Sequence, residues 1–163
     1  MIVVVVSVPH SGTQFVFKQL LGWLEPEIRN PARSADKHGK IWFHVDPDRL
    51  VELRSLTDYP WIVPMRHPLR IGESWKGRHK RLDRLVELLE IQRNFVHQFN
   101  PLYLPIDAAN RQDFLTEINQ RLGTELETDW ANFTSTGHWD WLDEAEREML
   151  MPYVRWYEFI CSS

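Results

Sequence analysis

The sequence predicts an α/β protein in which helices cover both faces of a central parallel sheet, a three-layer sandwich. Short apolar runs of strand length alternate along the chain with segments whose apolar residues recur at helical spacing. Strands separated by helices require crossover connections, and these give parallel pairing. Because 163 residues suffice for one unit of this kind, we expect a single domain over residues 1–163.

The first strand is expected in the run MIVVVVSV, whose β-branched residues occupy both alternating faces and which ends at Pro9. A polar turn follows, and residues 15–24 have helical periodicity limited by Pro26. Residues 27–40 mix Pro, Asn, Ser, Gly and charges without periodicity, so we expect an exposed loop there. This order predicts a strand that leads directly through a turn into a helix.

The middle of the chain is expected to hold a strand at KIWFHVD, a short helix over residues 50–56 and a third strand at WIVPM. Within WIVPM, Pro64 indicates incomplete pairing with one neighbouring strand. One long helix is expected over residues 71–99.

The C-terminal part is expected to begin with a fourth strand at PLYLPID. A helix follows at RQDFLTEINQRLG, where Gly123 is placed as a C-terminal stop. The last segment, WLDEAEREMLMPYVRWYEFI, predicts a helix interrupted at Pro152.

Composition excludes some functions. A formal charge of −4, from 19 basic and 23 acidic residues, argues against a nucleic-acid partner. The single cysteine, Cys161, allows no intrachain disulfide, and the apolar opening is too short for a signal peptide or membrane span, so we expect a cytoplasmic protein without membrane association. The scattered histidines predict no metal site. One local basic cluster is either a solvated helix face or a field that attracts an anion: Lys76, Arg78, His79, Lys80, Arg81 and Arg84.

The turn after the first strand, VPHSGTQF, has the character of an anion site. Ser11, Gly12 and Thr13 would present amides and hydroxyls at the positive end of the following helix. The alternative is an ordinary strand-to-helix turn in which Ser11 or Thr13 is the N-cap. The Walker pattern is absent from the sequence, which disfavours ordinary ATP or GTP hydrolysis.

A second candidate anion site follows the third strand, at MRHPLRIGES. Arg66 leaves the strand and Ser74 lies in the first turns of the next helix, so a guanidinium fork and a hydroxyl can hold a second phosphate. Because the carboxyl ends of parallel strands meet at one edge of a sheet, we expect this site beside the turn after the first strand.

These residues together resemble the sulfotransferases that use 3′-phosphoadenosine 5′-phosphosulfate (PAPS). The family's first motif has the form Pro-Lys-Ser-Gly-Thr-Thr-Trp after the first strand, and its second motif places a serine eight residues after an arginine, as Ser74 follows Arg66. Cytosolic members carry a catalytic histidine about as far before that arginine as His44 lies before Arg66. The first motif corresponds here to Pro9, His10, Ser11, Gly12, Thr13, Gln14 and Phe15.

The resemblance implies a P-loop nucleotide-kinase-like fold, PAPS as donor, adenosine 3′,5′-bisphosphate (PAP) as product, and no metal. In this interpretation the first motif holds the 5′-phosphosulfate, with Phe15 at the position of a Trp that packs on adenine, and Arg66 and Ser74 hold the 3′-phosphate. His44 would be the general base that accepts a proton from a hydroxyl or amine of a small-molecule or glycan acceptor. His10 would face the leaving oxygen.

The sequence departs from the family at three points. His10 replaces the lysine that stabilises the leaving oxygen, Asp107 ends a Pro-Ile-Asp run where the family often has Tyr-Glu-Asp, and the nearest match to the family's glycine-rich loop is the segment around Gly137. Two alternatives therefore stay open: a degenerate module that binds PAPS or PAP without catalysis, and a kinase-like phosphoryl transferase.

Overall fold

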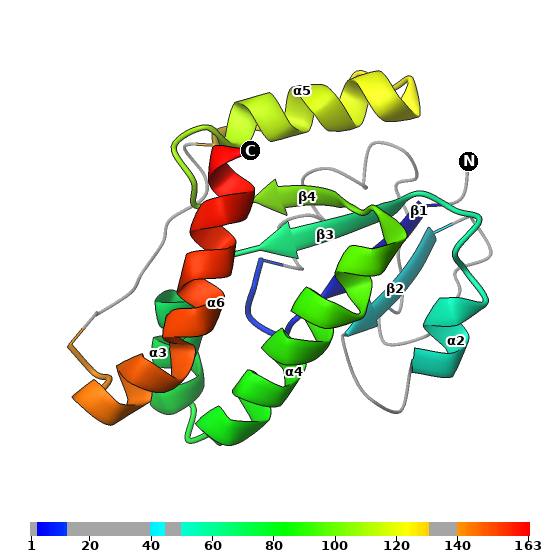
Figure 1. The fold of residues 1–163 in the computed structure, drawn as a ribbon. Helices are drawn as coiled ribbons and strands as arrows, with labels where there is room; N and C mark the ends of the chain where they lie inside the picture. Colours follow the sequence, from blue (N-terminus) through cyan, green and yellow to red (C-terminus); the bar gives the residue numbers. More distant parts are fainter. Residues whose placement is uncertain (1–2, 13–39, 45–49, 131–139) are drawn as a thin grey trace.

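The computed structural model describes residues 3–12, 40–44, 50–130 and 140–163, and its strands form one open parallel sheet (Figure 1). The strand order is β2-β1-β3-β4, and every pairing is parallel. The prediction of an α/β protein with a parallel sheet is confirmed. The strands are β1 (Val3–Ser7), β2 (Lys40–His44), β3 (Trp61–Met65) and β4 (Leu102–Pro105).

Helices connect and cover these strands. The predicted helix over residues 15–24 and the predicted loop over 27–40 lie outside the described residues, apart from Lys40 at the start of β2. The described helices are α2 (Leu50–Arg54), α3 (Pro68–Gly77), α4 (Leu82–Asn94), the 3₁₀ helix η3 (Val96–Phe99), α5 (Arg111–Leu122) and α6 (Glu144–Ser162).

The alternation of β1 explains the two cores. Val4 and Val6 pack with residues of α3, α4 and α6 on one face, whereas Val3 and Val5 pack with residues of β4 and α5 on the other. All four side chains have no exposed area, so β1 is the buried central strand that its valine run predicted. Figure 1 shows α3, α4 and α6 on one side of the sheet.

β1 and β3 separate toward their carboxyl ends. Their register covers two pairs, Val4 with Trp61 and Val5 with Ile62, whereas β3 continues to pair with β4 through Pro64 and Met65. The prediction of incomplete pairing at Pro64 is confirmed. β2 lies on one side of β1, and β3, the next strand in the chain, lies on the other side. The opening between β1 and β3 is therefore the topological switch point of the sheet, where ligands bind in α/β proteins.

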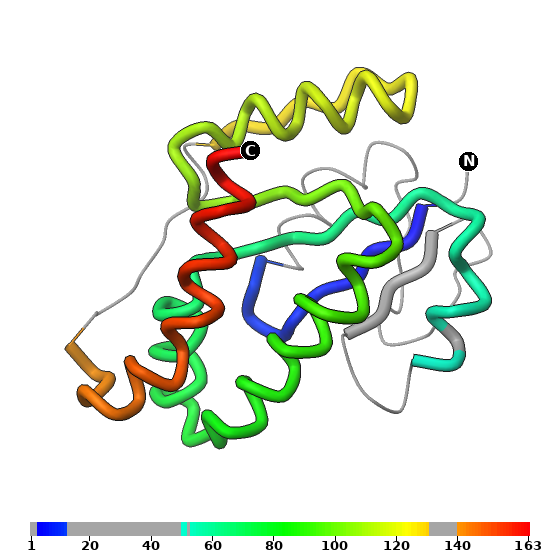
Figure 2. Tube along the Cα trace, viewed as in Figure 1, coloured from blue at the N-terminus to red at the C-terminus, as the bar shows by residue number. Residues whose placement is uncertain are grey.

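The prediction of one helix over residues 71–99 is wrong. The chain forms α3, α4 and η3, and it turns sharply between α3 and α4 (Figure 2). His79 has a left-handed backbone with φ of 56°, and the amide of Lys80 bonds back to the carbonyl of Trp75 at 2.9 Å. A residue in this conformation ends a helix, and the break lets α4 pack its own apolar stripe.

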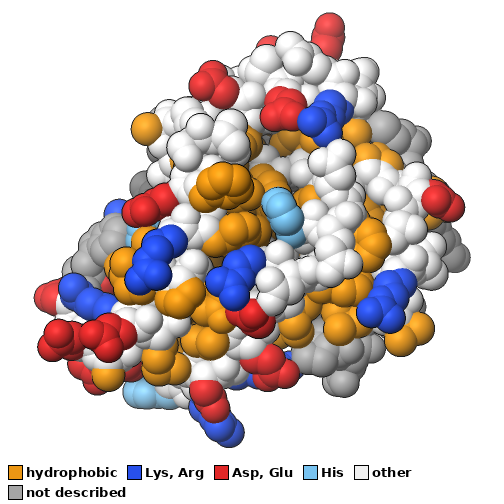
Figure 3. All heavy atoms as spheres, viewed as in Figure 1, with side chains coloured by type: hydrophobic (Ala, Val, Ile, Leu, Met, Phe, Trp, Pro, Cys, Tyr) orange, Lys and Arg blue, Asp and Glu red, His pale blue; other side chains and the backbone are white. Residues whose placement is uncertain are grey.

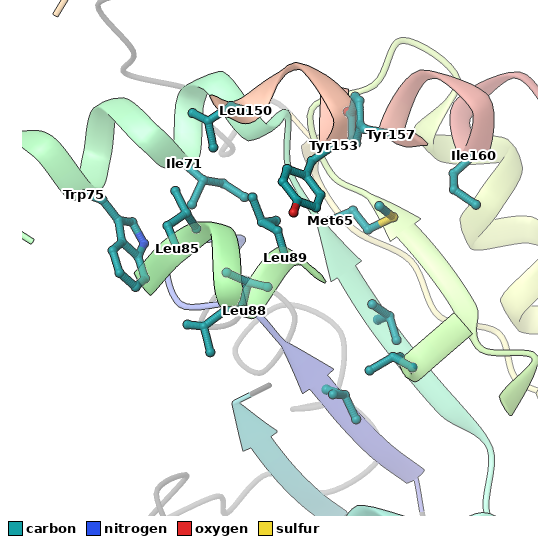
Figure 4. Close-up of a cluster of buried hydrophobic side chains, with 14 of the residues drawn as sticks. Met65, Ile71, Trp75, Leu85, Leu88, Leu89, Leu150, Tyr153, Tyr157 and Ile160 are labelled. Carbon is teal, nitrogen blue, oxygen red and sulfur yellow. The ribbon is translucent and has the colours of Figure 1, made fainter. Parts of the chain in front are cut away.

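The predicted interruption at Pro152 is also wrong, because α6 runs through it. A proline inside a helix removes one hydrogen bond and costs about 3 kcal/mol. Pro152 is exposed, while Leu150 and Tyr153 on the opposite side are buried against α3 and α4 (Figure 4), and Tyr157 is buried against His67 and Asp107. Burial of large side chains at about 1.5–3 kcal/mol each offsets the loss.

The described surface carries charges of both signs. On the face drawn in Figure 3, Lys and Arg side chains are interspersed with Asp and Glu among hydrophobic patches. None of the helices that the structure describes has the length and apolar content needed to span a bilayer.

Candidate functional site

The turn after β1 has an unusual backbone. His10 has φ of 69° and Gly12 has φ of 92°, so two residues of one short turn adopt positive φ. Ser11 lies between them and is buried, with both its amide (3.1 Å) and its hydroxyl (2.5 Å) donating to the carbonyl of Val8. Both donors of Ser11, the amide and the hydroxyl, are therefore used within the turn.

Two side chains from beyond β3 hold this turn. Nη1 of Arg66 donates to the carbonyl of His10 at 3.4 Å, and Nε1 of Trp75 donates to the carbonyl of Pro9 at 3.1 Å. Arg66 follows β3 directly, and Trp75 lies on α3 with 4% of its surface exposed. The structure thus brings the turn after β1 and the segment after β3 together, as their positions at strand ends predicted.

A pocket of about 330 Å³ opens where these segments meet. It contains three of the residues that the sequence singled out, His10, Arg66 and Ser74, although Arg66 and His10 are far apart in the chain. Its other lining residues are Glu73, Gly77, Arg78 and Trp141. The indole of Trp141 lies so close to Gly77 that a Cβ at this glycine would be 2.6 Å from it, so the ring packs directly on α3.

Acidic groups surround Arg66. Burial lowers the pKa of Arg66, and Arg70 lowers it further, whereas Asp107 and Glu73 oppose the shift. An arginine remains protonated in proteins, so the pocket keeps a cation whose charge two carboxylates partly offset. Glu73 itself is buried, with 2% of its surface exposed, and it lines the pocket.

Asp107 connects three elements beneath Arg66. Its carboxylate accepts from the backbone amide of His67, at 2.9 and 3.2 Å to its two oxygens, and from the hydroxyl of Tyr157 on α6. Burial and the neighbouring carboxylate raise the pKa of Tyr157, so the phenol stays protonated as the donor. The start of α3, and Arg66 immediately before it, are therefore fixed against β4 and α6.

The basic cluster divides into pairs and site residues. Lys76 pairs with Glu146, Arg81 with Asp83, and Arg84 with Glu87. Arg78 lines the pocket, and Nζ of Lys80 lies 3.0 Å from Nε2 of His10. The three ion pairs agree with the interpretation of the cluster as a solvated helix face, whereas Arg78 and Lys80 lie at the pocket and at the turn.

His44 is placed by its backbone. It ends β2 and is in register with Ser7 at the end of β1, so its Cα lies at the same sheet edge as the turn. Its side chain lies outside what the structure describes, as do the predicted site residues Thr13, Gln14 and Phe15 and the segment around Gly137.

Sequence reasoning did not assign Glu73, Trp141 or Lys80 to the site. Glu73 directly precedes Ser74 on α3, and both residues line the pocket. Lys80 belongs to the basic cluster, and Trp141 ends the segment TSTGHWDW around Gly137, but neither pattern indicated which of its residues reaches the site. In the described part of the chain, no three His, Cys, Asp or Glu side chains are grouped to hold a metal.

Comparisons with known proteins add no family. No protein-family model matches the chain, and neither a curated protein nor a solved structure matches it. The function of the chain is therefore inferred from its sequence motifs and from the geometry of the site.

The histidine at the start of α3 makes stability depend on pH. Nδ1 of His67 accepts from the amide of Leu69, and burial lowers the pKa of His67 below its usual 6.5, against the opposing effects of Asp107 and Glu158. The unfolded chain therefore binds a proton more readily than the folded chain, and stability falls as pH drops below about 6.5. We expect His67→Asn, which keeps an N-cap acceptor without titrating, to flatten this fall.

Urea unfolding followed by circular dichroism at pH 7, 6 and 5 measures the effect. The free energy of unfolding of the His67→Asn variant should fall less between pH 7 and 5 than that of the unsubstituted chain. Parallel losses in the two proteins would show that the protonation of His67 does not contribute.

Proposed function

We propose that this chain binds PAPS where the turn after β1 meets Arg66 and the C-terminal half of α3, and transfers its sulfuryl group to a hydroxyl or amine. The observation that carries the proposal is the contact between Arg66 and the carbonyl of His10, since it joins the two expected anion sites at adjoining strand ends. The site also lies where β1 and β3 separate, the position that ligands take in open parallel sheets. A P-loop nucleotide-kinase-like arrangement of the sheet is part of the proposal.

The residues of the pocket suit an anion attached to a flat ring. Arg66 and Arg78 supply guanidinium forks and Ser74 a hydroxyl, which together can hold the 3′-phosphate. Trp141 contributes an aromatic wall with 49% of its surface exposed. Glu73 and Asp107 limit the net positive charge, so binding depends on directed hydrogen bonds more than on the overall field.

In the proposed reaction His44 accepts the proton of the acceptor while the acceptor oxygen or nitrogen bonds to sulfur. The bond from sulfur to the bridging phosphate oxygen breaks, its electron pair stays on that oxygen, and PAP leaves. A positioned base contributes about 10²–10⁴-fold to such a step. The position of His44 beside Ser7 at the sheet edge supports this role.

A binding module without catalysis is the second candidate. The observation that favours it is His10 at the position of the family's lysine, because an imidazole is a less permanent cation at pH 7 than an ammonium. The two candidates share the donor site and differ in turnover.

Calorimetric titration with PAP, adenosine 5′-phosphate and ATP tests the donor site. A second phosphate held by charge-assisted bonds adds about 1.5–3 kcal/mol, so PAP should bind about 10–100-fold more tightly than adenosine 5′-phosphate. Equal affinities would contradict the proposal.

For catalysis, His44→Ala should abolish sulfuryl transfer from PAPS while the affinity for PAP is unchanged. Turnover equal to that of the unsubstituted chain would refute the assignment of His44 as the general base.

A further inference from the structure

A lysine from another part of the chain lies against the histidine of the turn. Nζ of Lys80 is 3.0 Å from Nε2 of His10, although the two residues are 70 positions apart. The resemblance had left this turn without the cation that the motif normally carries at position 10. The structure places one there from the connection between α3 and α4.

Three features hold Lys80 in this position. The left-handed His79 reverses the chain after α3, and the amide of Lys80 bonds to the carbonyl of Trp75 at 2.9 Å. Its ammonium also lies 5.3 Å from the centre of the Trp75 ring, within the range of a cation–π interaction. Because Trp75 itself bonds to the carbonyl of Pro9, one buried indole fixes both the turn and the cation.

The hydrogen bond also determines where the charge resides. An ammonium has donors and no acceptor, so Nε2 of His10 must accept from Lys80. The imidazole is then neutral, with its proton on Nδ1. The positive charge at this position of the turn is carried by Lys80, and His10 orients it.

We propose that Lys80 is the cation that binds the anion at the turn after β1, in place of the lysine that His10 replaces. This inference rests on the proposed function for the identity of the ligand, the 5′-phosphosulfate of PAPS. His10 is a positioning residue that holds the ammonium through Nε2. The oxygen that bridges phosphorus and sulfur gains negative charge as its bond to sulfur breaks, and an ammonium donor at the turn stabilises that charge.

Titration of Lys80→Gln with PAP and, separately, with inorganic pyrophosphate tests the inference. Loss of one charge-assisted contact should weaken each ligand about tenfold or more. Arg81→Gln is the matched control, because Arg81 is the adjacent exposed cation and pairs with Asp83 away from His10. Lys80→Arg keeps the charge and should bind within a few-fold of the unsubstituted chain.

Relocating the charge separates binding from a structural role. The double variant His10→Lys with Lys80→Gln should recover most of the affinity that Lys80→Gln loses, because a lysine again lies at the turn. Unchanged affinity in Lys80→Gln, or equal losses in Lys80→Gln and Arg81→Gln, would overturn the inference. So would a double variant that is no better than Lys80→Gln.

The pyrophosphate titration keeps the two proposals apart. If the unsubstituted chain binds pyrophosphate but does not prefer PAP to adenosine 5′-phosphate, the proposed function fails while the role of Lys80 is still decided by its pyrophosphate affinity. If the chain binds neither ligand, both proposals fail.

Discussion

Gly12→Ala is expected to lower the free energy of unfolding by about 2–5 kcal/mol, the sum of backbone strain and overpacking. Gly12 has φ of 92°, which residues with a Cβ rarely adopt. A Cβ at this position would lie 1.9 Å from Cδ1 of Ile106, a side chain with no exposed area that has little room to move. Urea unfolding followed by circular dichroism measures the loss.

Gly123→Ala is the matched control for the backbone contribution. Gly123 ends α5 with φ of 65°, and nothing lies within 4 Å of a Cβ built there, so this variant carries only the cost of a left-handed backbone, about 1–2 kcal/mol. Adding Ile106→Val to Gly12→Ala should recover part of the steric loss. Equal destabilisation by Gly12→Ala and Gly123→Ala would show that the turn tolerates a side chain against Ile106.

The strands were predictable because their signal is local. β1 and β3 are short apolar runs bounded by prolines and polar turns, and a fully buried parallel strand requires such a run. The proline inside β3 even indicated where pairing with β1 stops, since it lacks the amide that a ladder needs.

The helices were harder to predict because packing decides where they end. The apolar periodicity over residues 71–99 continues through a break that a left-handed His79 creates, and nothing in the local composition required histidine to adopt that conformation. At Pro152 the sequence predicted a break where the structure has a continuous helix. The local rule predicted an interruption, and the buried face of α6 outweighed it.

The residues of the site also divide into those that local sequence signals predicted and those that tertiary packing places. His10 and Arg66 follow strand ends and Ser74 lies in the helix after β3, so topology brings them together once the sheet is parallel. Lys80 and Trp141 reach the turn and the pocket through tertiary packing, Lys80 on the indole of Trp75 and Trp141 on Gly77. A basic cluster was visible in the sequence, but which of its members pair with acidic side chains depends on the positions of α4 and α6.

Arg66→Ala is expected to remove most of the preference for PAP over adenosine 5′-phosphate. The guanidinium lines the pocket, and a hydrogen bond to a charged group contributes about 1.5–3 kcal/mol, which corresponds to about 10–100-fold in affinity. The affinity for adenosine 5′-phosphate should change much less, because that ligand has no 3′-phosphate. Calorimetric titration of both ligands measures the ratio.

Arg66 also compensates Asp107 and Glu73, so its removal leaves acidic groups at a partly buried position and lowers stability as well. Arg66→Lys keeps the charge and separates the effect on stability from the effect on binding. It should restore stability more fully than it restores the preference for PAP, since an ammonium cannot form the two parallel bonds of a guanidinium.

Arg121→Ala, which removes an arginine paired with Glu117 on α5, is the control for net charge. A PAP preference in Arg66→Ala that matches the Arg121→Ala variant would place the 3′-phosphate elsewhere, and the assignment of this pocket would fail.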